Sequence, residues 1–418
     1  MRRFRTSKAR TGFQFKMKNG TISDMKTKMA SVVVAALAAG AALAQENAIE
    51  KFDPRMAIEK SAVDAKGVKW IDGRYLPLEG KCFSNTTAFY DRLPSNVTEK
   101  VNGGVRASRR HSSGMQFRFV TDSKVLHFKW KPVNARLDMD HMPSTGVSGI
   151  DVYRQDAGGK WRYVKTGRIR NATAGGSLTV DWVPGAPCIV NLPLYNGIAS
   201  FSLGIEKSAK IEALGPRKSG VNKPVVFYGT SITHGGCASR PGLAYSSIVG
   251  RELDVPIVNL GFSGSGRMEF EMSEHLAAID ASCYVLDCLW NMSSLRNAKA
   301  KSEADLKGVR PGPDAIVRVR YEPFIRNLRA KRPGVPIVMA EQCDVFCNGP
   351  NAKDRFIKKL YEKLIAEGWK NLVYLPKTDM YTGDREGTVD GCHPNDLGMM
   401  SMSKAFGKAV KEALDSVK

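Results

Sequence analysis

Three residues from two distant parts of the chain have the chemistry of a hydrolytic site. Ser231 stands in a Gly-Thr-Ser turn after the apolar run 225–228, and Asp390 and His393 lie in one short segment near the C-terminus. A serine hydroxyl is a weak nucleophile at neutral pH and needs a base that a carboxylate holds in one tautomer. We therefore predict Ser231 as the nucleophile, His393 as the base and Asp390 as the residue that orients it.

Attack on an ester carbonyl also produces an oxyanion, which hydrogen-bond donors must stabilise. Suitable donors are a backbone N–H at a glycine and an amide side chain such as that of Asn291, which follows the apolar run 284–289. A glycine-rich loop, Gly-Phe-Ser-Gly-Ser-Gly at 261–266, follows another such run. This loop lacks the Gly-x-Ser-x-Gly pattern of a nucleophile elbow, so Ser263 is a poor alternative nucleophile.

These loops require a sheet whose strands end at one common edge. From residue 225 onward, apolar strand-like runs alternate with segments in which apolar residues have helical spacing. Such alternation predicts a parallel sheet with helices on both faces, and open sheets of this kind bind ligands at their carboxyl edge. We expect strands at 225–228, 255–260, 283–289, 335–341 and 371–376, and helices that include 267–280, 354–367 and 395–417.

The chain before this sheet has a different period. Between residues 71 and 213, apolar residues alternate with polar ones, and glycine-containing turns separate the runs. Several short alternating runs predict a β-sandwich. The segment 214–224 is rich in Gly, Pro and charge, and we interpret it as a linker to a second domain at 225–418. The alternating runs include Met115, Phe117 and Phe119; Ile150 and Val152; Trp161 and Tyr163; and Phe201, Leu203 and Ile205, with Asn102-Gly103-Gly104 among the turns.

The N-terminal 44 residues have the features of a secretory signal peptide. An apolar run of small residues at 30–44 follows Lys26 and Lys28 and ends in Ala-Leu-Ala. This run is too short to cross a bilayer, which takes about 20 residues. We expect cleavage after Ala44, export to the periplasm or the medium, and no stable membrane anchor, with residues 45–70 as a lead-in segment.

The formal net charge of +22 does not by itself indicate a nucleic-acid partner. The basic residues form no run with interleaved aromatics, and no nucleic-acid-binding motif is present. A basic, solvated surface explains the charge, and an acidic polysaccharide or cell envelope is the alternative anionic partner. We expect no nucleic-acid partner, and the oligomeric state stays open.

Eight cysteines lie beyond the predicted signal peptide, where export would permit disulfides. Cys343 and Cys347 are either a local pair or two free thiols on one helical turn. No Cys-x-x-Cys pair occurs, which removes the usual zinc and redox signatures. We expect neither a metal nor an organic cofactor.

In order and spacing, the four polar blocks between residues 224 and 415 resemble those of the SGNH, or GDSL-type, esterases and acylhydrolases. The resemblance implies that Ser231 is both nucleophile and oxyanion donor, that Gly264 and Asn291 are the other two donors, and that His393 and Asp390 complete the triad. It also implies a flavodoxin-like three-layer α/β domain. Two upstream motifs, Phe-Tyr-Asp-Arg-Leu-Pro at 89–94 and Met-Pro-Ser-Thr-Gly-Val-Ser-Gly at 142–149, are similar to a bacterial subfamily in which a jelly-roll-like β-sandwich precedes that domain.

The chain departs from this family pattern at two positions. Thr230 stands where the family name implies Asp, which leaves the local support of the turn unexplained. The third block reads Leu-Trp-Asn-Met where Gly-x-Asn-Asp is usual, so Trp290 narrows the pocket or stacks on a sugar ring. His234 and His141 are further candidates for the pocket wall, with a surface loop as the alternative place for His234.

These observations predict an exported serine esterase. It would hydrolyse small acyl esters, acetyl esters above all, on a small molecule or a polysaccharide, by way of an acyl-enzyme. A carbohydrate- or envelope-binding protein that has lost activity is one alternative, and an acyltransferase that uses the same residues is another.

Overall fold

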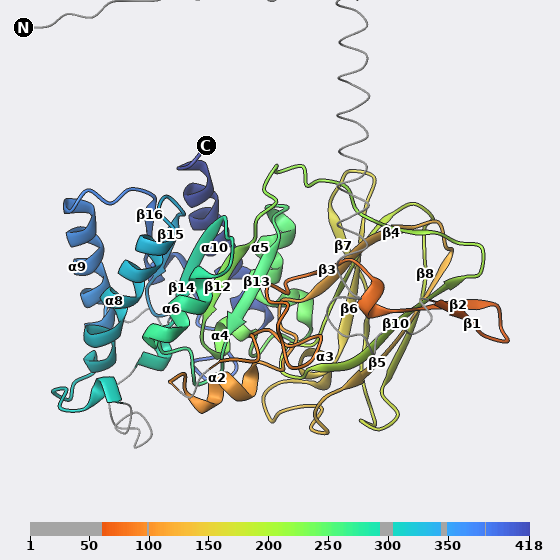
Figure 1. Cartoon of the computed structure of the whole chain (residues 1–418), viewed down its shortest axis with the longest axis horizontal. Coiled ribbons are helices and arrows are strands. Elements are labelled where there is room, and N and C mark those ends of the chain that lie inside the picture. Colours follow the sequence, from red (N-terminus) through yellow and green to blue (C-terminus); the bar gives the residue numbers. More distant parts are fainter. Residues whose placement is uncertain (1–60, 98–99, 293–303, 344–348, 381) are drawn as a thin grey trace, which may run out of the picture. The chain divides into compact units, whose positions relative to one another are not determined.

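Five apolar segments form a parallel sheet in the computed structural model (Figure 1), as the alternation of strands and helices predicted. The strands lie in the order β13-β12-β14-β15-β16, which is 2-1-3-4-5 along the chain and is the flavodoxin-like order. The order reverses between β12 and β14, and ligands bind at such a reversal. The bounds are β12 (Val225–Gly229), β13 (Ile257–Gly261), β14 (Cys283–Asp287), β15 (Ile337–Ala340) and β16 (Leu372–Leu375).

Helices cover both faces of this sheet. Val226 and Tyr228 of β12 pack on one face against α6 (Phe270–Ala277), α8 (Ala315–Lys331) and α9 (Ala352–Ala366). Val225 and Phe227 pack on the other face against α5 (Tyr245–Glu252) and α10 (Asp396–Asp415). Because both faces are buried, the strands are apolar at nearly every position, as the sequence indicated.

The structure describes residues 61–97, 100–292, 304–343, 349–380 and 382–418, and they belong to one compact unit. The predicted signal peptide and residues 45–60 of the lead-in therefore lie outside the described residues, as does Cys347. The seven cysteines in the described ranges are free thiols, so the pairing of Cys343 stays a prediction. None of the described helices combines the length and apolar character that a membrane span requires.

Two antiparallel sheets precede the parallel sheet, and their inner faces share one core. The apolar residues that the sequence placed in the runs of β4, β6 and β10 are all buried, as predicted. β7 differs: it is the edge strand of its sheet, its register with β6 shifts between Val152 and Tyr153, and Tyr163 is 48% exposed. The first sheet contains β1 (Ser61–Val63), β2 (Val68–Asp72), β10 (Ile198–Glu206), β5 (Val125–Pro132) and β8 (Gly176–Asp181); the second contains β11 (Ile211–Ala213), β4 (Gln116–Thr121), β9 (Pro187–Asn191), β6 (Ile150–Gln155) and β7 (Trp161–Gly167), with β3 (Leu78–Glu79) paired to β4.

Two local expectations were wrong. The end of the predicted lead-in forms strands β1 and β2, which pair with each other at the edge of the first sheet. The Asn-Gly-Gly signal at 102–104 does not join two strands but begins helix α2 (Gly103–Ser108). The Asn102 side chain caps this helix by accepting from the N–H groups of Gly104 and Val105, which is a favoured role of asparagine at a helix N-terminus.

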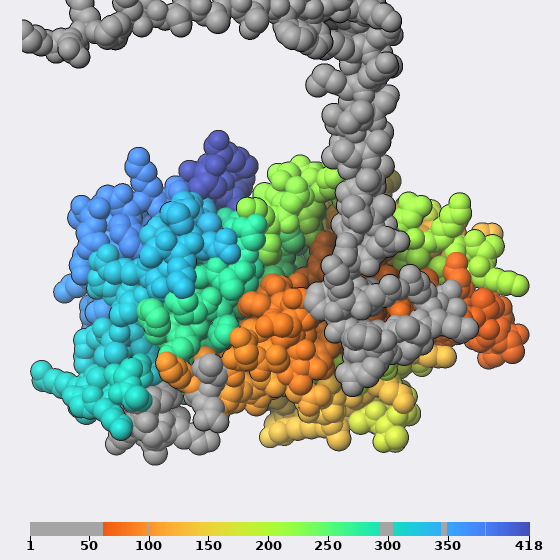
Figure 2. All heavy atoms as spheres, in the orientation of Figure 1, coloured from red at the N-terminus to blue at the C-terminus, as the bar shows by residue number. Residues whose placement is uncertain are grey.

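The β domain, defined here as the elements from β1 to β11, packs directly on the α/β domain that runs from β12 to α10. Figure 2 shows the orange part of the β domain against the green and teal surface of the α/β domain. Leu93, Val97, Val101 and Val105 are buried in the same core as β12 and α8. A segment that lies within the predicted sandwich by sequence thus completes the core of the following domain.

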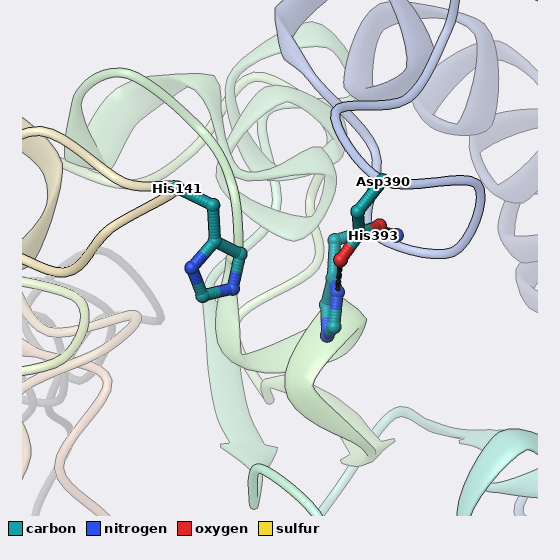
Figure 3. A group of neighbouring side chains, drawn as sticks. All are labelled: His141, Asp390 and His393. Carbon is teal, nitrogen blue, oxygen red and sulfur yellow. Dashed lines mark hydrogen bonds and ion pairs between the residues drawn. The ribbon is translucent and has the colours of Figure 1, made fainter.

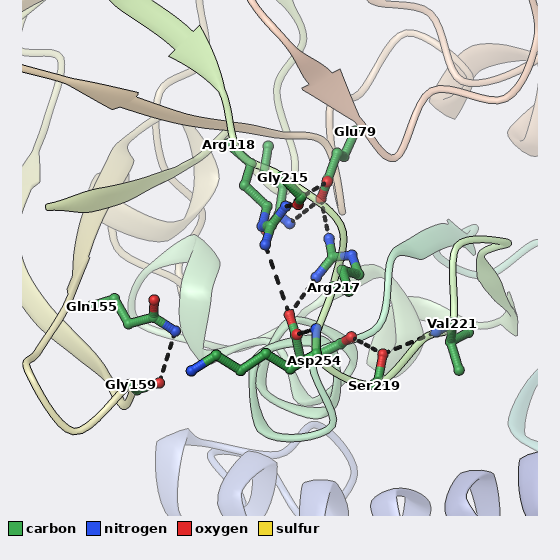
Figure 4. A network of polar contacts seen from close by, with 11 residues as sticks. Glu79, Arg118, Gln155, Gly159, Gly215, Arg217, Ser219, Val221 and Asp254 are labelled. Atoms are coloured by element: carbon green, nitrogen blue, oxygen red, sulfur yellow. Dashed lines mark hydrogen bonds and ion pairs between the residues drawn. The ribbon is translucent and has the colours of Figure 1, made fainter. Parts of the chain in front are cut away.

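Charged groups also tie the predicted linker 214–224 to both domains (Figure 4). Arg217 is buried, and its guanidinium donates to Glu79 of β3 and, at 3.0 Å, to Asp254 of the loop before β13. Arg118 of β4 lies 3.9 Å from the same two carboxylates. The linker is therefore held in place by ion pairs.

Candidate active site

A short helix at the end of β12 carries the predicted nucleophile. Ser231 is the first residue of α4 (Ser231–His234), and Thr230 is its N-cap. The Thr230 hydroxyl accepts from the N–H of Ile232 at 3.2 Å, which satisfies one of the free donors at the helix start. Thr230 thus supplies the local support of the turn that the sequence left unexplained.

The structure brings Ser231, His393 and Asp390 into one chain of hydrogen bonds. The Ser231 Oγ lies 2.8 Å from His393 Nε2, although the two residues are 162 positions apart. His393 Nδ1 lies 2.7 Å from Asp390 Oδ2. Because an ionised carboxylate only accepts, Nδ1 carries the proton, and Nε2 is free to accept from the serine.

The loop before α10 fixes the carboxylate and the imidazole together. Asp390 Oδ1 accepts from the backbone N–H of Cys392 at 2.9 Å and of His393 at 2.7 Å. Burial alone would raise the pKa of Asp390, but the hydrogen bonds from His393 and Cys392 outweigh it and lower that pKa to about 2. Asp390 is therefore ionised throughout the neutral range.

The two other predicted oxyanion donors follow the strands on either side of β12. Gly264 lies in the loop after β13 with φ of +66°, a conformation that favours glycine. The loop packs tightly on the nucleophile turn, because a Cβ at Gly266 would meet the Gly229 carbonyl oxygen at 1.9 Å. Asn291 lies in η4 (Leu289–Met292) after β14, and its Oδ1 is buried without a hydrogen-bond partner among the described residues.

His141 lies beside the triad, where the sequence allowed it (Figure 3). It comes from the loop between β5 and α3 (Ser144–Val147) of the β domain, and its ring centroid is 5.5 Å from that of His393. Trp290 precedes Asn291 and donates from its indole N–H to the Cys343 carbonyl. This bond orients the indole, while the part that Trp290 plays in a pocket stays a prediction.

His234 was predicted to line the substrate pocket or to lie in a surface loop, and both predictions were wrong. His234 is fully buried, and its ring stacks on Tyr195 with centroids 4.1 Å apart. Its Nε2 lies 3.2 Å from His111 Nδ1 and 3.4 Å from the Arg92 guanidinium. Burial, together with the positive charge of Arg92, lowers the pKa of His234 well below its usual value, so this imidazole is neutral.

Two β-domain residues that the sequence analysis did not single out support the site from behind. The Tyr195 hydroxyl donates to the carbonyl of Ser231 at 2.9 Å. Arg92 is buried and donates to the carbonyls of Asn259 and Gly261 at 3.1 and 2.9 Å, at the end of β13. The Phe-Tyr-Asp-Arg-Leu-Pro motif contains Arg92 and could have identified it as a functional residue. The only sequence feature near Tyr195 is the Asn-Gly turn that follows it, which does not predict a role at the site.

A second carboxylate lies beneath the nucleophile helix. Asp287 ends β14 and accepts from the hydroxyls of Thr233 at 2.9 Å and Tyr245 at 3.0 Å. Burial raises the pKa of Asp287 to about 7, and these two bonds only partly oppose the effect. Neither of these two hydrogen bonds involves a triad residue, and Thr233 belongs to α4. We therefore infer that Asp287 holds α4 in place.

Comparison with known proteins agrees with this architecture. Residues 222–411 match the model of the GDSL-like Lipase/Acylhydrolase family, and residues 68–211 match the model described as N-terminus of Esterase_SGNH_hydro-type. The α/β domain, over residues 222–411, belongs to the GDSL-like lipase/acylhydrolase family. Members of this family are generally carboxylic ester hydrolases. No curated protein sequence is significantly similar to the chain.

The matches to solved structures extend over both domains. A GDSL-like lipase of Bacteroides ovatus is 28% identical with a TM-score of 0.66, and the match covers 83% of this chain and 98% of that one. A salicylyl-acyltransferase from a tetracycline biosynthetic pathway is 18% identical with a TM-score of 0.64, over 85% of this chain and 100% of that one. A family two carbohydrate esterase of Clostridium thermocellum, solved with cellohexaose, is 14% identical with a TM-score of 0.50, over 72% and 93% of the two chains. The last two show a shared fold.

Proposed function

We propose that this member of the acylhydrolase family is an exported serine esterase that removes small acyl groups, acetyl groups above all, from carbohydrate. The observation that carries the proposal is the unbroken hydrogen-bond chain from Ser231 through His393 to Asp390, at the point where the strand order of the parallel sheet reverses. Such a chain is the arrangement that activates a serine hydroxyl.

In the proposed reaction, Ser231 attacks the ester carbonyl while His393 Nε2 takes the hydroxyl proton. Asp390 stays ionised, holds Nδ1–H and stabilises the imidazolium that forms. The N–H groups of Ser231 and Gly264 and the Asn291 amide stabilise the oxyanion. His393 then protonates the leaving alcohol, and a water molecule repeats the sequence on the acyl-enzyme.

The surface position of the triad supports a large alcohol such as a polysaccharide. The side chains of His393 and Asp390 are 21% and 39% exposed, so a leaving group can extend along the surface rather than into the protein. The carbohydrate esterase solved with cellohexaose has the same fold, which makes that fold compatible with an oligosaccharide ligand. Trp290, next to the proposed oxyanion donor Asn291, offers an aromatic ring on which a sugar stacks.

The nucleophile is tested by Ser231→Ala. We expect the hydrolysis of p-nitrophenyl acetate to fall by about 10⁴-fold or more without loss of folding, because serine hydrolases keep little rate without their nucleophile. A fluorophosphonate probe should label Ser231 in the parent protein and in the control variant Ser263→Ala, which removes the neighbouring loop hydroxyl. Turnover that survives in Ser231→Ala would reject the assignment.

The substrate and the location need separate measurements. Acetylated polysaccharides and p-nitrophenyl esters of increasing chain length should show a preference for acetyl, and a preference for long chains would contradict the proposal. Because a fold neighbour is an acyltransferase, products should also be analysed with added alcohols; acyl transfer in place of acid release would favour that second function. N-terminal sequencing of the exported protein should begin at Gln45.

A further inference from the structure

Three metal-ligating side chains meet at the open side of the site (Figure 3). His141, Asp390 and His393 each place one ligand atom within 4.8 Å of the other two. Two imidazoles and a carboxylate are a ligand set that suits Zn²⁺, with a fourth position left for water. We propose that these three residues form an inhibitory binding site for a divalent transition-metal ion, and for Zn²⁺ in particular.

The cluster is accessible and needs only a small adjustment to close around an ion. His141 and Asp390 are exposed, and His393 is partly exposed. Zinc bonds of about 2.0–2.2 Å require the ligand atoms to approach to roughly 3.3 Å of one another. An exposed histidine in a loop covers the remaining distance by rotating its side chain. Asp390 and His393 lie 2.7 Å apart through their shared proton, and if the ion takes the place of that proton they separate by about half an ångström.

The charges of the cluster favour a cation. Asp390 supplies the carboxylate of the cluster, and its Oδ2 already lies 2.7 Å from His393 Nδ1. His141 is therefore the residue that turns the His393–Asp390 pair into a three-ligand site.

An ion bound here removes the base from the reaction. Coordination at His393 Nδ1 uses the lone pair of that nitrogen, so the ring proton moves to Nε2, which then no longer accepts the Ser231 proton. Coordination at Nε2 occupies the accepting atom itself. Inhibition rests on the proposed function, whereas binding of the ion does not.

Binding is tested on the purified full chain after treatment with a chelator. Zn²⁺ in a calorimeter, and Co²⁺ by its visible absorption, should bind the parent protein at one site. We expect His141→Ala to weaken binding by about tenfold or more, since loss even of a supporting group costs 10- to 100-fold. The matched control is His127→Ala, which removes a histidine of β5 whose Nδ1 lies 3.0 Å from the Thr179 hydroxyl. Equal affinity in parent and His141→Ala proteins would overturn the site.

Inhibition is tested with p-nitrophenyl acetate, with each rate divided by that of the same variant in the presence of chelator. Zn²⁺ should inhibit the parent and His127→Ala proteins reversibly, Mg²⁺ should not, and His141→Ala should need about tenfold or more Zn²⁺ for the same loss. Binding that depends on His141 in a protein without esterase activity would overturn the proposed function and support the site. An active esterase whose response to Zn²⁺ is independent of His141 would overturn the site alone.

Discussion

Two carboxylates near the nucleophile helix α4 differ in exposure and in charge. Asp390 lies in a surface loop and accepts from three N–H groups, which outweigh burial and lower its pKa to about 2. Asp287 is buried beneath α4 and accepts from two hydroxyls, and burial raises its pKa to about 7. The open side of Ser231 thus holds a fully charged carboxylate beside its base, whereas the carboxyl of Asp287 on the interior side is one whose burial favours the protonated form.

This difference separates the chemistry of the site from its support. Groups that exchange protons with substrate must be reached from solvent, and a charge costs little there. Groups that fix the helix are enclosed, where an unpaired charge is costly and hydroxyl and carbonyl partners are preferred. Substitutions on the open side should therefore change the rate, and substitutions on the interior side should change the stability.

The largest expected effect is that of Asp390→Asn on the rate. The two backbone N–H groups of Cys392 and His393 keep the amide oxygen in the place of Oδ1, so the amide NH2 faces His393 Nδ1 and donates to it. This favours the wrong tautomer of His393, and we expect kcat to fall by about 10⁴-fold. Thermal unfolding should change little, because Asp390 is on the surface. Asp384→Asn, in the same loop region but outside the triad, serves as the control. If Asp390→Asn lost much stability but kept a normal rate, Asp390 would be a structural residue and not a catalytic one.

Arg92→Met tests the interior side. The guanidinium donates to three carbonyls, of Asn259, Gly261 and Ser108, and the thioether replaces none of these bonds. Since each buried group left unsatisfied costs about 1–3 kcal/mol, we expect the free energy of unfolding to fall by about 3 kcal/mol or more in urea titrations. Arg110→Met, at an exposed position, should leave it nearly unchanged. Equal stability of the two variants would show that the hydrogen bonds of Arg92 do not stabilise the fold.

Asp287→Asn sharpens the comparison through pH. The pKa of Asp287 is raised on folding, so the folded state keeps a proton that the unfolded state releases, and stability falls as pH rises from about 4 to about 7. Between pH 5 and pH 8 this effect amounts to roughly 1–3 kcal/mol in the parent protein. The variant should lack this part of the pH dependence, as measured by urea unfolding at both values. Asp280→Asn, 63% exposed, is the control and should keep it.

The sequence predicted those features of the fold and the site that depend on residues close together in the chain. The strands of the parallel sheet are continuous apolar runs, and Asp390 and His393 make contact across only three positions, so their partnership was visible before the fold was known. The position of Ser231 at the end of a strand likewise follows from the pattern. Thr230 needed the structure, because its hydroxyl works through helix capping rather than through the chemistry of the family motif.

The contacts between the domains were not visible in the sequence. His234 looked like a loop residue, because nothing local shows that Tyr195 and His111 of the β domain enclose it. Tyr195 reaches the carbonyl of Ser231 across 36 positions and a change of domain. Burial of this kind depends on which surfaces meet, and a periodic pattern reports only which residues share a face.

The Arg92 contact has a consequence for how the chain is divided. Family models split the sequence near residue 215, yet a chain that began there would lack the donor for the Asn259 and Gly261 carbonyls and the apolar side chains of residues 93–105 that complete its core. The two segments match different family models but share one hydrophobic core. Replacing the β domain with that of a relative would therefore also replace residues that hold the loops around Ser231 in place.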